Sequence, residues 1–239
     1  MAIRRMVDLG GEMGGLWASL GASSSAGSRV IQFVAAHQGE GTSLVARELC
    51  RFVAQRAGKT VWLIDLDLQD SPQTAAIAGD PALYGGLGKP THASPDGLSF
   101  VTVQPPLRQA DGEWIPDGRY VVAYPVGEAR WWVTRFRQES LRGAQRAQVL
   151  PGIDYWAALR RHADLIVIDS PSADRSRTAL TLAPYVDETV LVVAADQPDI
   201  RGATQLKDAI TRSGGLCSGL FYNRARSAPP VFSGRGKAT

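Results

Sequence analysis

The chain has 239 residues, of which 44% are hydrophobic and 21% are charged, and its formal net charge is +3. This composition is typical of a globular protein and excludes general disorder. No stretch approaches the ~20 apolar residues of a membrane span, and residues 1–20 lack the continuous apolar run of a secretory signal. The two cysteines, Cys50 and Cys217, lack metal-ligand spacing. We therefore expect a cytoplasmic protein with one large domain.

The first predicted elements alternate between strand and helix. Residues 29–36 form an apolar run typical of a buried strand, and residues 43–56 place apolar side chains at helical spacing. Further buried strands are predicted at Thr60–Asp65, Ala163–Asp169 and Glu188–Ala194. Because these runs are continuous rather than alternating, the strands are expected to be covered on both faces. The pattern predicts an α/β fold with a doubly wound, mostly parallel sheet.

The segment from residue 70 to residue 151 differs, because glycine and proline turn signals interrupt it. Residues 98–103 and 119–123 are candidate strands, and residues 127–146 are a candidate helix. We interpret the segment as an elaborated region inside a single domain that spans residues 29–224. Residues 1–28 are expected to be a mobile leader with a possible short helix, and residues 225–239 a mobile tail.

Residues 36–43, at the first strand-to-helix junction, match most of a phosphate-binding loop. Gly41 and Ser43 occupy the sixth and eighth places of the pattern G-x-x-x-x-G-K-[ST]. Glycines in such a loop let backbone N–H groups surround phosphate oxygens at a helix N-terminus, and Ser43 would bind Mg²⁺. The seventh place, where a lysine reaches the β- and γ-phosphates, is Thr42. The loop is thus predicted to keep its backbone cradle and to lack its cation.

Two strand ends carry carboxylates where phosphate chemistry uses them. Asp65 and Asp67 lie at the end of the second predicted strand, and Asp169 ends a later strand in the manner of a Walker B element. Aspartate also ends strands for capping reasons, so each residue alone is a weak sign. Together with the loop these make three strand ends in this order, which favours a nucleotide site with Mg²⁺.

On these motifs the chain resembles the cytoplasmic domain of bacterial tyrosine kinases (BY-kinases) of capsule and exopolysaccharide systems, within the ParA/MinD-like P-loop ATPases. The resemblance covers residues 28–72 and 150–224. Residues 39–43 match four of the five positions of G-E-G-K-S, residues 63–67 match L-I-D-x-D, residues 167–171 match I-I-D-[ST]-P, and residues 219–224 resemble the family's G-V-V-L-N strand.

The resemblance implies ATP or ADP with Mg²⁺ as the cofactor and assigns roles to particular residues. Ser43 and Asp169 would hold the metal, and Asp65 and Asp67 would be the catalytic carboxylates, vestigial if phosphoryl transfer has been lost. In the family, the asparagine that matches Asn223 commonly faces the base. The implied nucleotide-binding residues are Gly39, Glu40, Gly41, Thr42, Ser43 and Asn223.

Three departures from the family imply a pseudo-kinase. Thr42 replaces the loop lysine, and losing one preorganised charge-stabilising donor costs ~10²–10³-fold in rate. Residues 227–239 contain no tyrosine cluster of the kind that BY-kinases autophosphorylate. The leader sequence after Glu12 lacks the arginines of the family's oligomerisation helix. The resemblance therefore implies an inactive protein or a weak ATPase or tyrosine kinase.

Two alternatives stay open. An active ATPase or tyrosine autokinase could use Arg175 or Arg177, which follow the third motif, as a substitute cation, although we favour the interpretation that these arginines cap or solvate the next helix. His37 in the loop would be a poorer substitute. A ParA/MinD-like nucleotide-switched positioning protein is the second alternative, and Thr42 counts against it because such switches depend on the loop lysine.

Residues 130–137 interleave aromatic and basic side chains. They could form a protein or membrane contact, a nucleic-acid platform, or an amphipathic helix that packs its aromatic side chains on the sheet. The resemblance implies an inner-membrane polysaccharide co-polymerase as the partner and a peripheral position at the inner membrane. It also implies a possible homo-oligomer, and a nucleic-acid partner is not expected.

Overall fold

The computed structural model describes residues 9–21, 27–93 and 96–225, and its centre is an eight-stranded sheet. The strand order is β10-β9-β1-β8-β2-β6-β5-β3, parallel from β10 to β6 and antiparallel for β5 and β3. The predicted doubly wound, mostly parallel α/β sheet is thus confirmed. The strands are β1 Arg29–Val34, β2 Thr60–Asp65, β3 Thr91–His92, β4 Val101–Gln104, β5 Val121–Pro125, β6 Trp131–Phe136, β7 Arg146–Val149, β8 Ala163–Asp169, β9 Glu188–Ala194 and β10 Cys217–Asn223.

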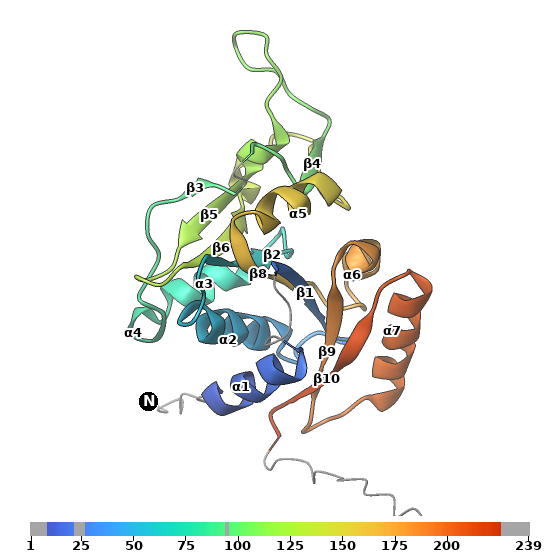
Figure 1. The fold of residues 1–239 in the computed structure, drawn as a ribbon. Helices are drawn as coiled ribbons and strands as arrows, with labels where there is room; N and C mark the ends of the chain where they lie inside the picture. Colours follow the sequence, from blue (N-terminus) through green and yellow to red (C-terminus); the bar gives the residue numbers. More distant parts are fainter. Residues whose placement is uncertain (1–8, 22–26, 94–95, 226–239) are drawn as a thin grey trace, which may run out of the picture.

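Helices cover both faces of this sheet (Figure 1). One core contains side chains of α1, α2 and α3, and the opposite face is covered by α5 and by a smaller cluster under α6 and α7. Burial on both faces explains why β1, β2 and β8 are continuous apolar runs. The helices are α1 Gly10–Ser19, α2 Thr42–Ala54, α3 Pro72–Ala78, α4 Pro81–Tyr84, α5 Ile153–Arg160, α6 Thr178–Leu182 and α7 Ile200–Arg212, with 3₁₀ turns at Asp117–Tyr120, Gln138–Ser140 and Ala183–Tyr185.

The possible short helix of the leader is present as α1. Its Met13 is 1% exposed and belongs to the same core as α2, and Gly14 lies against the Phe52 ring. The remaining predictions for the leader and for the tail concern residues 1–8, 22–26 and 226–239, which lie outside the described residues. Within the described ranges, no helix is long and apolar enough to cross a membrane.

The predicted helix at 127–146 is wrong, because its centre is strand β6 beside β2. Trp131 and Val133 face the core under α2, whereas Trp132 and Phe136 face the opposite core, which is the two-residue alternation of a strand. Aromatic and β-branched side chains also favour a strand. The aromatic-basic segment is therefore built into the sheet and is not an amphipathic helix.

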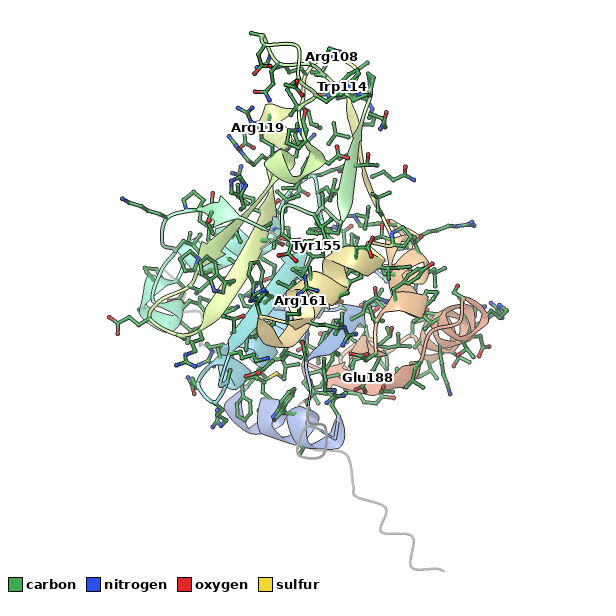
Figure 2. The ribbon with its side chains drawn as sticks, turned by 45° about the horizontal axis from the view of Figure 1, so that its top comes forward. Arg108, Trp114, Arg119, Tyr155, Arg161 and Glu188 are labelled. Carbon is green, nitrogen blue, oxygen red and sulfur yellow. The ribbon has the colours of Figure 1, made fainter. Side chains whose placement is uncertain are left out.

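The elaborated region adds strands to the domain, as predicted. The candidate strands 98–103 and 119–123 correspond to β4 and β5, each displaced toward the C-terminus. β4 pairs with β7 in a separate antiparallel sheet. Between β4 and β5 the chain projects from the body of the molecule, and Figure 2 shows Arg108 and Trp114 together at the tip of this projection. The Arg108 guanidinium lies 4.0 Å from the centroid of the Trp114 ring.

Candidate nucleotide-binding site

The loop between β1 and α2 has the backbone of a phosphate cradle. Gly39 and Gly41 have φ angles of 89° and 92°, a left-handed conformation that favours glycine. No side chain caps the N-terminus of α2, and within the described chain the N–H groups of Gly41, Thr42 and Ser43 make no hydrogen bond. Free N–H groups at a helix N-terminus are suited to bind an anion.

These groups open into a hollow of about 330 Å³ at the carboxyl ends of β1, β2 and β8. It brings together the predicted residues Gly39, Gly41, Thr42, Ser43, Asp67 and Asp169. Among the described residues that line it, none is a lysine. The lining is His37, Gln38, Gly39, Gly41, Thr42, Ser43, Asp67, Asp70, Pro72, Asp169, Ser170, Pro171, Ser172 and Arg175.

Glu40 and Asn223 do not line the hollow but hold the loop from behind. The Asn223 amide donates to the Glu40 carbonyl at 2.8 Å and accepts from the Arg224 N–H. The Glu40 carboxylate accepts from the N–H groups of His37 and Ala194. Both side chains are buried and their polar atoms are engaged, so they brace the loop against β9 and β10. This position differs from the base-facing one expected for Asn223.

The two aspartates at the end of β2, Asp65 and Asp67, occupy different environments. Asp65 is buried and accepts from the N–H groups of Gln73 and Asp67, which fixes the chain between β2 and α3. Burial, reinforced by the charge of Asp169, raises the pKa of Asp65 well above its usual range. Asp67 faces the hollow, where its carboxylate lies 3.1 Å from the Arg175 guanidinium.

Asp169 at the end of β8 provides a test of whether Mg²⁺ fits. Its Oδ2 accepts from the Gln73 side chain at 2.7 Å, and its Oδ1 is buried without a hydrogen-bond partner in the described chain. Burial raises the pKa of Asp169 to about 6. A cation near Ser43 and Asp169 would satisfy the buried oxygen and offset the cost of its charge. These residues therefore fit Mg²⁺.

Protein ligands alone would not complete this metal site. No group of three or more His, Cys, Asp or Glu side chains that could hold a metal occurs among the described residues. Mg²⁺ is usually held by one or two carboxylates together with water and substrate phosphates. Ser43 and Asp169 would then hold the ion only together with a nucleotide.

Sequence reasoning missed Gln73, which is fully buried beneath the hollow. Its side-chain amide donates to Asp169 and to the Ser43 carbonyl, and it accepts from the Arg47 guanidinium at 2.9 Å. The Arg47 guanidinium also donates to the Tyr84 hydroxyl, which in turn donates to the Glu48 carboxylate. Gln73 thus connects the loop, β8 and α3. No motif marks this residue in the sequence.

Four basic side chains lie near the loop in which the lysine is missing, and they differ in position. Arg175 lines the hollow and pairs with Asp67, whereas Arg177 stands at the N-cap of α6 and does not line it. Arg224 donates to the Gly39 carbonyl at 2.6 Å. His37 lies between two carboxylates, with Nε2 2.8 Å from Asp199 and Nδ1 3.5 Å from Asp174.

Solved structures of bacterial tyrosine kinase domains share this fold. The chimerical protein CapA2B2 matches with a TM-score of 0.58 at 14% identity, over 93% of this chain and 88% of that chain. The kinase domain of the Escherichia coli tyrosine kinase ETK matches with a TM-score of 0.56 at 15% identity, over 92% of this chain and 79% of that chain. The VpsO kinase domain matches with a TM-score of 0.52 at 19% identity, over 88% of this chain and 89% of that chain. No family model and no curated protein sequence matches the chain.

The resemblance seen in the motifs is thus confirmed at the level of the fold. The chain has the fold of a bacterial tyrosine kinase domain, with its loop, carboxylates and last strand meeting at one edge of the sheet. The identities of 14–19% establish this fold and leave activity to be argued from the site.

Proposed function

We propose that this protein is a catalytically degenerate BY-kinase-like P-loop protein of bacterial exopolysaccharide synthesis and export. It would act in the cytoplasm, peripheral to the inner membrane, as a regulatory or scaffolding partner of a membrane co-polymerase. Thr42 carries this proposal, because it lines the phosphate hollow in the place of the loop lysine. The structural likeness to tyrosine kinase domains supports the family part of the proposal.

The site supports retained nucleotide binding. Unpaired N–H groups of Gly41, Thr42 and Ser43 would bind phosphate oxygens, and Ser43 and Asp169 would hold Mg²⁺. Mg²⁺ bound there would supply charge neutralisation to the phosphates. Binding of this kind needs backbone N–H groups and ligands for Mg²⁺, and the chain has N–H groups and two candidate ligands, Ser43 and Asp169, without a lysine.

Phosphoryl transfer needs more than binding, because charge develops on the transferred group and must be stabilised. The lost lysine is one such stabilising group. Removing a single donor of this kind costs ~10²–10³-fold in rate. We therefore assign to this chain a nucleotide-responsive or structural role.

One observation favours an active ATPase or tyrosine autokinase as the second candidate. Arg175 lies on the rim of the hollow, and its ion pair with Asp67 holds the guanidinium there. In this alternative Arg175 would replace the lysine in cis. Arg177 has no such support, because it does not line the hollow. The ParA/MinD-like positioning protein stays less favoured, because Thr42 replaces the loop lysine on which such switches depend.

Calorimetry with Mg-ATP and Mg-ADP tests the proposal on the wild type, Thr42→Lys and the matched control Thr42→Ser. We expect the lysine variant to gain at least about tenfold in Mg-ATP affinity and the serine variant to match the wild type. Equal affinity in all three variants would contradict the assignment of Thr42 to the vacant lysine position. Turnover by the wild type that disappears in Arg175→Ala, and not in Arg177→Ala, would establish the second candidate instead.

A further inference from the structure

A second hollow lies on the other side of the Asp67–Arg175 ion pair. Its volume is about 440 Å³, and it shares Asp67, Pro171 and Arg175 with the phosphate hollow. One wall is strand β7 and the other is the chain that leads into α6. The lining is Leu66, Asp67, Leu68, Gln69, Ala147, Gln148, Val149, Pro171, Arg175, Ser176 and Thr178.

The wall formed by β7 is an unpaired strand edge. Among the described residues β7 pairs with β4 alone, and the hydrogen bond from the Leu150 N–H to the Phe100 carbonyl fixes the pattern of this antiparallel ladder. Hydrogen-bonded and non-hydrogen-bonded residue pairs alternate in such a ladder. The backbone of Gln148 therefore bonds to β4, and the backbone N–H and C=O groups of Ala147 and Val149 point away from β4. Within the described chain these outward groups have no hydrogen-bond partner.

The other edge of the same small sheet, on β4, is closed by side-chain hydrogen bonds. On β4, the outward N–H of Val101 donates to the Ser99 hydroxyl, and that of Val103 donates to Asp117. Side chains thus close the β4 edge against further pairing, which is how proteins commonly protect an edge strand. The β7 edge has no such protection, and it borders a hollow beside the candidate nucleotide site.

Charge and polarity indicate what this groove would bind. Leu68 and Val149 supply apolar surface, and Ser176 and Thr178 supply hydroxyl groups that bond to each other. The two charged residues of the lining, Asp67 and Arg175, pair with each other. Beside the lining, Arg146 precedes Ala147 and Arg177 lies between Ser176 and Thr178; both arginines are exposed, and within the described chain neither forms an ion pair. The charge that flanks the groove is therefore positive, which complements an acidic ligand.

We propose that an extended, acidic segment of a partner protein binds in this groove as a third strand beside β7. Its backbone would bond to the outward N–H and C=O groups of Ala147 and Val149, and its alternate side chains would contact Leu68. The inference deepens the proposed scaffolding function and rests on it for the nature of the occupant. The groove itself requires no nucleotide, because its backbone donors and acceptors lie outside the phosphate hollow.

A labelled peptide of alternating glutamate and valine is the probe, measured by fluorescence anisotropy on the full chain. Two further forms carry N-methyl groups on all glutamates or on all valines. Because alternate residues of a strand point their N–H groups to opposite edges, we expect one methylated form to bind like the parent and the other to bind at least about tenfold more weakly. Equal binding of the two forms would overturn strand addition. Tighter binding of a lysine–valine peptide would overturn the acidic assignment.

Protein variants test the same contacts from the other side. Val149→Pro removes an outward N–H that does not belong to the β4 ladder, and Val149→Ala keeps it. We expect the proline variant to lose the probe and the alanine variant to retain most of its affinity, with thermal melting as the check on folding. Arg177→Glu should also lose the probe, whereas Arg212→Glu at the end of α7 should not. Equal probe binding by Val149→Pro and Val149→Ala would contradict the proposal.

Nucleotide binding supplies the independent readout. Val149 lies outside the phosphate hollow, so Val149→Pro should bind Mg-ATP as the wild type does. Loss of the probe with unchanged Mg-ATP binding supports the docking site. Unchanged probe binding with altered Mg-ATP binding overturns it and leaves the proposed function standing.

Discussion

The guanidinium of Arg175 lies 3.1 Å from the carboxylate of Asp67, and this ion pair stands between the two hollows at the edge of the sheet. It joins the chain after β2 to the chain after β8, which are 108 residues apart. Side-chain exposures of 35% for Arg175 and 12% for Asp67 mean that water partly screens the pair. The pair is therefore placed to organise the site more than to stabilise the fold.

Replacing Arg175 by alanine should change the free energy of unfolding by less than about 1 kcal/mol, because partly exposed ion pairs contribute little. Mg-ATP affinity should fall severalfold, since a cation at the rim of the phosphate hollow is lost. Chemical denaturation and calorimetry measure the two effects. Arg177→Ala, whose side chain lies outside the hollow, should leave both quantities unchanged. A large loss of stability in Arg175→Ala would show that the pair is a structural element.

Gly41 should tolerate substitution much less than Gly39, although both have positive φ angles. A Cβ atom at Gly41 would lie 1.9 Å from the Asn223 amide nitrogen, whereas at Gly39 it would meet nothing within 4 Å. Gly39→Ala should therefore cost about 1 kcal/mol from backbone strain alone. Gly41→Ala adds a steric clash and should cost more than about 2 kcal/mol. Similar unfolding midpoints for the two variants would contradict this account of the loop.

Asp169 should make the folded state less stable as the pH rises from about 4 to about 6. Burial raises its pKa from 3.8 to about 6, so the folded protein holds a proton in this window that the unfolded chain has released. This stabilising contribution is complete below pH 3.8 and is lost as the pH rises through about 6. Asp169→Asn should weaken the dependence, to which the buried Asp65 contributes with the same sign, while the exposed control Asp208→Asn should keep it in full. Urea midpoints between pH 4 and 7 measure the slope.

His37 should contribute a separate pH dependence at higher pH. Its hydrogen bond to Asp199 raises the pKa of the imidazole above the ordinary value of 6.5. The contribution is fully present below pH 6.5 and is lost as the pH rises through the raised pKa of the folded state. An NMR titration of the ring should give a pKa above 6.5 that falls in Asp199→Asn. A pKa at or below 6.5 would contradict the geometry at this loop.

The sequence predicts the parallel part of the fold because its signals are local. Continuous apolar runs mark β1, β2, β8 and β9, and Gly41 with Ser43 marks the loop. Strand β6 was predicted as a helix, because arginines among aromatic residues resemble an amphipathic face until the pairing partner β2 is known. Gln73 could not be predicted, since its role depends on contacts with Asp169 and Arg47 that the fold brings together.

Asn223 illustrates the same limit within the site. Its place at the end of the last strand is visible in the sequence, but its direction depends on the path of residues 39–41, to which it donates a hydrogen bond. Tertiary contacts of this kind decide whether a polar side chain faces a ligand or supports the loop that binds it.

The rate of Mg-ATP hydrolysis and tyrosine autophosphorylation by the wild type, compared with Thr42→Lys, tests the central claim most directly. We predict no turnover above background in the wild type, because the cradle can bind phosphate but lacks the lysine that stabilises the transferred group. Thr42→Lys should bind more tightly and serves as the positive control for an intact site. Turnover by the wild type at a rate equal to or above that of Thr42→Lys would contradict the claim that this chain is catalytically degenerate.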